Sequence, residues 1–174
     1  RSVLPNVPSD PGALHPLVVH FPVALLLVAP LFLLMGAISK NDRPQLRSCV
    51  LVLMALGVLA AWVAVWTGEH AATIARITAP QAASVIEQHE ESAEATAVIF
   101  TVLLAVFAIR VAVDYLRKEN TVRRPMRVFC IVFLVVYCVC SLVVVDAAHQ
   151  GGRLVHQFGV RAQMGSAPPG GTNP

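Results

Sequence analysis

Four long apolar runs constrain this chain more than any other feature of its sequence. Each run holds roughly the 20 residues that an α-helix needs to cross about 30 Å of hydrocarbon. None of them alternates with a period of two residues, as a half-buried strand would. Only 13% of the 174 residues are charged, whereas a soluble domain carries roughly 25%, so this much apolar surface requires lipid. The runs cover residues 14–38, 46–67, 93–113 and 128–148.

The segments between the runs predict how the helices are arranged. The connection over residues 39–45 is short, which favours antiparallel neighbouring helices. We therefore predict an all-α fold, a four-transmembrane-helix up-down bundle over residues 14–156. An extension at 1–13 precedes it, and a flexible tail rich in Gly and Pro follows at 157–174.

Prolines predict two irregularities in this bundle. Pro16 suits an opening turn of the first helix, whereas Pro22 and Pro30 remove hydrogen bonds and are expected to kink it. The segment 68–92 is amphipathic and acidic, and Pro80 divides it. We expect this segment to form a loop of two short helices that lie on the membrane surface and could act as a lid.

The basic residues predict the orientation of the chain. Most Lys and Arg residues follow the first and third runs, and the positive-inside rule makes that side cytoplasmic. Both termini and the segment 68–92 are then non-cytoplasmic. Arg110 and Asp114, at spacing i, i+4, are expected to pair near the cytoplasmic side. Nine of the thirteen basic residues lie there: Lys40, Arg43, Arg47, Arg110, Arg117, Lys118, Arg123, Arg124 and Arg127.

All the histidines fall on the opposite, non-cytoplasmic side. Ionisable residues near membrane depth are candidates for function. Imidazole there suits the ligation of haem iron, the binding of another metal, or the relay of protons to a quinone or along a pathway. The six histidines are His15, His20, His70, His89, His149 and His156.

Haem is the ligand that the predicted bundle favours. The first and third helices lie diagonally, as do the second and fourth, so His20 is expected to face His89 and His70 to face His149. Cofactors in bundles are held by side chains of facing helices. We therefore predict one or two haems with these four histidines as iron ligands and with His15 as a further cofactor-binding residue.

Simpler roles are open for several of these side chains. His15, His70 and His156 could lie among lipid headgroups, and the ring of His20 could bond a carbonyl that Pro22 leaves free. Asp146 lies three residues before His149 and could orient its imidazole.

A metal site of histidine and carboxylate is also conceivable around His70 and His89. Glu69, Glu90 and Glu91 lie beside these histidines. However, the E-x-x-H spacing of di-iron bundles is absent, and the helix dipole alone could explain acidic residues at the start of the third helix.

Four short motifs resemble a known family. The chain resembles the DUF2231 family of bacterial four-helix membrane proteins over nearly its whole length, from the first helix to the Gly-Gly segment. The resemblance implies a membrane redox role, because such proteins occur beside Rieske iron-sulfur or cytochrome c domains, and it makes haem b the expected cofactor. His156 stands where relatives usually have Tyr. The motifs are Leu14-His15-Pro16-Leu17-Val18-Val19-His20-Phe21-Pro22, Thr67-Gly68-Glu69, His89-Glu90-Glu91 and Gly151-Gly152-Arg153-Leu154-Val155.

Two functions follow as hypotheses. The first is a b-type cytochrome subunit of the bacterial inner membrane that transfers electrons between quinol or a membrane partner and a periplasmic carrier. The second is a cofactor-free structural or assembly subunit of a respiratory or photosynthetic complex, suggested by small residues such as Ala60, Ala61 and Ala64. A transporter is weaker because few polar residues line the spans. We expect no nucleic-acid partner and no stand-alone enzyme.

Overall fold

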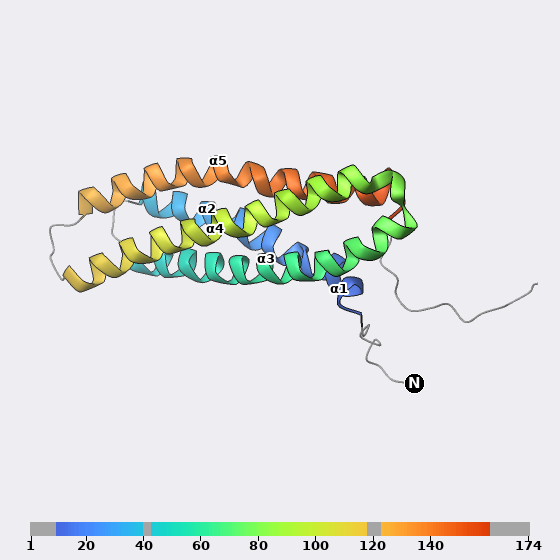
Figure 1. Ribbon diagram of the computed structural model, residues 1–174. Coiled ribbons are helices and arrows are strands. Elements are labelled where there is room, and N and C mark those ends of the chain that lie inside the picture. Colours follow the sequence, from blue (N-terminus) through green and yellow to red (C-terminus); the bar gives the residue numbers. More distant parts are fainter. Residues whose placement is uncertain (1–9, 40–42, 118–122, 161–174) are drawn as a thin grey trace, which may run out of the picture.

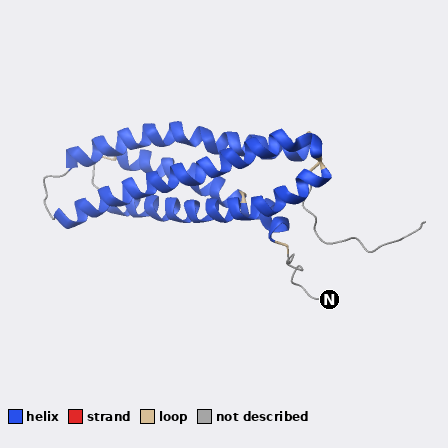
Figure 2. Ribbon diagram, in the orientation of Figure 1, coloured by secondary structure: helices blue, strands red, loops and turns tan. Residues whose placement is uncertain are grey.

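The computed structural model describes residues 10–39, 43–117 and 123–160, which form an elongated bundle of helices (Figure 1). Figure 2 shows that the described part of the chain is helical and contains no strand. Four helical segments are long and apolar enough to cross a membrane. The predicted all-α bundle of four membrane-spanning helices is therefore confirmed. The elements are α1 (Pro11–Val18), α2 (His20–Ile38), α3 (Pro44–Thr78), the 3-10 turn η1 (Pro80–Ala82), α4 (Ala83–Arg117) and α5 (Arg123–His156).

The helices pack as a closed ring. Helix α2 packs against α3, α3 against α4, α4 against α5, and α5 against α2. The short helix α1 packs mainly on α3. The diagonal partners across the ring are therefore α2 with α4 and α3 with α5.

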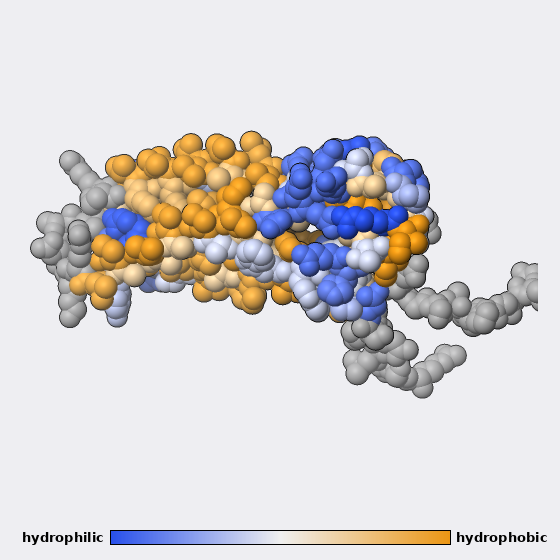
Figure 3. All heavy atoms as spheres, in the orientation of Figure 1, coloured by the Kyte–Doolittle hydropathy of each residue, from blue (hydrophilic) through white to orange (hydrophobic). Residues whose placement is uncertain are grey.

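Three of the helices are longer than a bilayer is thick. α3 and α4 have 35 residues each and α5 has 34, which gives each a length of roughly 50 Å, against about 30 Å of hydrocarbon. Figure 3 shows an apolar surface over most of the bundle and a hydrophilic one at the end near η1. We call this end, formed by α1, η1 and the adjoining turns of α3, α4 and α5, the polar end.

The long helices correct the expectation about the connecting segment 68–92. Residues 68–92 do not form short helices on the membrane surface, because α3 continues to Thr78 and α4 begins at Ala83. Only the turn at Pro80 divides them, as expected, since proline disfavours a helical residue before it. Helix α5 likewise continues through Gly151 and Gly152 to His156. Most of the expected extension, residues 1–9, and of the expected tail, residues 161–174, lies outside the described residues.

Proline also explains the break between α1 and α2. Asp10 caps α1 by accepting a hydrogen bond from the Gly12 amide at 3.0 Å. The helix ends at Val18, four residues before Pro22, because Pro22 has no N–H for the Val18 carbonyl and its ring clashes there. The helix is thus interrupted at Val19, before Pro22, whereas Pro16 lies inside α1 and not in its opening turn.

Pro30 lies inside α2 and leaves the carbonyl of Leu26 without its helical donor. The hydroxyl of Tyr137, on α5, donates a hydrogen bond to that carbonyl at 2.8 Å. Tyr137 is fully buried, with 0% of its surface exposed, and packs against Phe100 and Phe133 in the core. A side chain 111 positions away thus completes the backbone bonding of α2.

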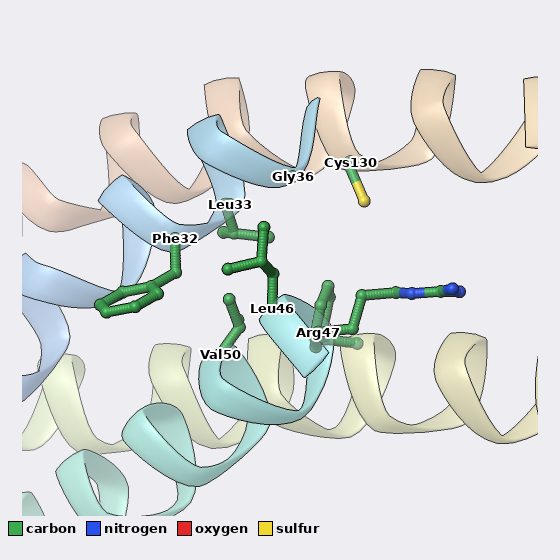
Figure 4. Close-up of a pocket in the computed structure, with 8 residues that line it drawn as sticks. Phe32, Leu33, Gly36, Leu46, Arg47, Val50 and Cys130 are labelled. Atoms are coloured by element: carbon green, nitrogen blue, oxygen red, sulfur yellow. The ribbon is translucent and has the colours of Figure 1, made fainter. Parts of the chain in front are cut away.

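The end of the bundle opposite the polar end carries an ion-pair cluster. Asp114 pairs with Arg110, as predicted, and also with Arg47 of α3 at 3.3 Å. A cavity beside Arg47 has a volume of only about 10 Å³, which is room for about one water molecule. Figure 4 shows the guanidinium of Arg47 pointing away from the aliphatic side chains around the cavity. This cavity is therefore too small for a cofactor.

We predict that Tyr137→Phe lowers the free energy of unfolding by about 1–3 kcal/mol, because the Leu26 carbonyl then lacks a donor inside the membrane. Pro30→Ala restores a backbone N–H for that carbonyl, so the Tyr137→Phe loss should shrink in the Pro30→Ala background. Denaturant titrations of the four proteins in detergent measure both values. An equal loss in the two backgrounds would show that the hydroxyl acts elsewhere.

Candidate functional site

Two histidine side chains meet at the polar end. His15 of α1 and His89 of α4 are each partly buried, and their ring centroids lie 6.1 Å apart with the planes at 78°. They come from diagonally placed segments, so the rings meet across the inside of the bundle. Among the residues that the structure describes, they are the two histidines whose rings touch.

His15 is held by a buried threonine of α3. Its Nδ1 lies 3.1 Å from Thr67 Oγ1. The same hydroxyl lies 3.0 Å from the Val63 carbonyl and 3.2 Å from the Ala64 carbonyl, and carbonyls can only accept. These two carbonyls favour the arrangement in which the hydroxyl proton is directed to a carbonyl and Thr67 accepts from His15. In that tautomer of neutral His15, Nδ1 carries the proton and Nε2 carries the free lone pair.

His89 has the same arrangement with a backbone partner. Its Nδ1 lies 2.9 Å from the carbonyl oxygen of Ala147 on α5. Because that oxygen cannot donate, Nδ1–H is the donor and Nε2 again holds the lone pair. Histidines that bind metals commonly donate their second ring nitrogen to a carbonyl or another acceptor in this way. Both imidazoles are thus prepared to act as ligands through Nε2.

Glycines on the two flanking helices make room for these rings. A Cβ atom on Gly68 of α3 would lie 3.0 Å from His15 Cε1, and one on Gly151 of α5 would lie 3.2 Å from His89 Cε1. At Gly12 a Cβ would come within 2.9 Å of the Ala71 amide nitrogen, so α1 and α3 approach closely there. Side chains at these positions would displace the two imidazoles.

The expected pairing of His20 with His89 is wrong, since His89 meets His15. Positions 15 and 20 are about 140° apart around a continuous helix, and the break at Val19 falls between them. With His15 directed inward, His20 is exposed at the start of α2.

The expected pair of His70 and His149 also does not form. Both are described, both are exposed, and no ring contact joins them. His70 instead lies against Trp66, with ring centroids 5.2 Å apart, and its Nδ1 is 2.9 Å from the Trp66 carbonyl. His156 is exposed at the end of α5.

Two acidic residues of the polar end, Asp146 and Glu90, have other partners. Asp146 accepts a hydrogen bond from Ser92 at 2.6 Å instead of orienting His149. Glu90 forms an ion pair with Arg76. Within the described ranges no three His, Cys, Asp or Glu side chains are grouped so that they could hold a metal ion. A metal at His15 and His89 would therefore need further ligands from a cofactor or from solvent.

The comparison with known families agrees with this architecture. The family described as "Predicted membrane protein (DUF2231)" matches residues 11–164. The chain belongs to the DUF2231 family. The match spans every described helix and confirms the family that the motifs indicated. No curated protein and no solved structure matches the chain, so the activity of this DUF2231 protein has to be argued from the site itself.

We predict that in Thr67→Val the imidazole of His15 no longer prefers the tautomer protonated at Nδ1, because valine offers Nδ1–H no acceptor. Thr67→Ser keeps a hydroxyl and serves as the matched control. Nitrogen NMR of histidine-labelled full chain in detergent distinguishes the two tautomers, with His15→Gln assigning the signal. The Nδ1–H form of His15 should be lost in Thr67→Val alone and His89 should not change; an unaltered His15 signal would disprove this hydrogen bond.

Proposed function

We propose that the chain is a b-type cytochrome subunit of a membrane electron-transfer complex, with His15 and His89 as the axial ligands of one haem b. The observation that carries this proposal is the meeting of two imidazoles from diagonal helices, each with Nδ1 in a hydrogen bond. These hydrogen bonds favour the tautomers whose Nε2 is free to bind a metal. Two such nitrogens are a typical protein contribution to haem iron.

The donor set fits this cofactor better than a bare metal ion. Haem brings four nitrogens of its own and needs one or two from the protein, whereas a metal ion alone usually needs three or four protein ligands. Two imidazoles on one metal have ring centres roughly 5–6.5 Å apart, since each metal–nitrogen bond is about 2 Å long. The observed 6.1 Å lies in that range.

The residues around the pair suit electron transfer. When bound, haem supplies reversible one-electron chemistry. Thr67 and the Ala147 carbonyl fix the ring orientations and raise the basicity of both imidazoles. Partial burial limits the access of water, and rigid helices, not loops, carry both ligands.

The location of the pair suggests the direction of electron flow. The site lies where the apolar runs end, next to Gly68 and Gly151. A lipid-soluble quinol or a membrane subunit can reach this level from the bilayer, and a carrier such as a cytochrome c or a Rieske protein can reach it from the water. The distribution of Lys and Arg favours the periplasm for that water side.

We predict that the full chain, purified after expression with sufficient haem, shows a b-type reduced-minus-oxidised spectrum with about one haem per chain. His15→Ala and His89→Ala should each lose it, because each removes a ligand. His20→Ala and His149→Ala remove exposed histidines and should retain it. Pyridine haemochrome quantitation measures the content.

Circular dichroism and gel filtration establish that each variant is folded. A folded wild-type chain without a Soret band would refute the cytochrome and favour the cofactor-free subunit. Loss of haem in His20→Ala but not in His15→Ala would show that His20, and not His15, binds the haem iron.

A further inference from the structure

An apolar groove opens on the outside of the bundle between the first span and α3. It has a volume of about 340 Å³, and its lining is entirely apolar. Its residues lie in membrane-spanning helices, so the groove opens towards hydrocarbon, and an apolar chain is the natural occupant. The lining includes Phe21, Leu25, Leu56, Leu59, Ala60 and Val63.

The same face of α3 leads from the groove to a histidine. Val63 and His70 are seven residues apart, so they share a helix face and are separated by roughly 10 Å along the axis. Val63 lines the groove and His70 is exposed at the polar end. A molecule lying along this face therefore has apolar surface at one end and an imidazole at the other.

His70 presents a hydrogen-bond acceptor. Its Nδ1 donates to the Trp66 carbonyl at 2.9 Å, so Nε2 of the neutral ring carries a lone pair. No described side chain donates a hydrogen bond to that atom. The matching headgroup is one that offers an O–H.

We propose that the groove and His70 bind a long-chain quinol, with the apolar tail in the groove and a ring hydroxyl donating to His70 Nε2. This deepens the proposed function, on which it rests, by naming the electron donor. A phospholipid fits less well, because its phosphate lacks an O–H at neutral pH and would lie near the exposed carboxylate of Glu69.

Oxidation of the bound quinol to the quinone breaks two O–H bonds and releases two electrons and two protons. A haem held by His15 and His89 would accept these electrons one at a time. The proton of the bonded hydroxyl passes to His70 Nε2, and the second proton passes to water, which reaches the exposed ring. A later transfer from His70 to water restores the neutral imidazole.

The test measures binding of a decyl-substituted benzoquinol to the full chain in phosphatidylcholine nanodiscs, by equilibrium dialysis with chromatographic quantitation. We expect saturable binding above that of empty nanodiscs. Ala60→Phe fills the groove and should weaken binding at least tenfold. Ala105→Phe makes the same change at an exposed position of α4 and should leave binding unchanged.

The headgroup contact is tested at His70. His70→Ala should weaken binding about tenfold, whereas His70→Gln keeps an acceptor and should restore most of it. Equal binding by Ala60→Phe and Ala105→Phe, equal binding by His70→Ala and wild type, or binding no greater than to empty nanodiscs would each overturn the quinol site.

This test separates the quinol site from the cytochrome. His15→Ala should bind the quinol as wild type does while it lacks haem, since binding needs no cofactor. A wild-type chain that carries haem but binds no quinol would overturn the quinol site alone. Saturable binding by a wild-type chain that carries no haem after expression with sufficient haem would support the quinol site and refute the cytochrome.

Discussion

Inside a bilayer, a backbone carbonyl or amide without a partner costs several kcal/mol, and the helices of this protein are arranged around that constraint. Pro30 leaves the Leu26 carbonyl without its helical donor in mid-membrane, and Tyr137 of the neighbouring helix α5 donates a hydrogen bond to it instead. Pro22 likewise removes a helical hydrogen-bond donor nearer the polar end, but there the helix ends at Val18. The break separates α1 from α2, and α1 packs on α3 with His15 at Thr67. The break that Pro22 causes in the first span thus sets the position of His15.

The length of the helices explains why the site is built on rigid elements. Because α3, α4 and α5 continue past the apolar runs, the residues level with the membrane boundary remain helical. Thr67, Gly68, Ala147 and Gly151 are therefore fixed in rotation as well as in depth. Beyond them a second small core, including Ala82, Ile86 and Leu154, holds the helix ends together. Loops at this level would fix the two imidazoles less accurately.

The sequence was sufficient for the spans and for the gathering of the histidines, because both depend only on the apolar runs. It was not sufficient for the pairing. Choosing His15 over His20 requires the rotation of α1 about its axis, which depends on the break at Val19 and on the contact of Gly12 with α3. The Thr67-Gly68 and Gly151-Gly152 pairs were visible, but their role requires knowing that both helices continue through them. The amphipathic pattern of 68–92 fits a helix on a membrane surface and a helix end projecting from it equally well.

Three histidines in this structure have the same hydrogen bond at Nδ1, with different consequences. In His89 and His70 a backbone carbonyl, which can only accept, engages Nδ1, and in His15 the Thr67 hydroxyl takes that place with two carbonyls beside its own proton, so the arrangement favours an Nε2 lone pair in all three. The first two are partly buried and face each other, which suits shared ligation of one metal centre. The third is exposed beside an apolar groove, where water can solvate the charge that a transferred proton creates. Burial and the neighbouring surface, rather than the residue type, therefore decide which imidazole binds a cofactor and which accepts a proton.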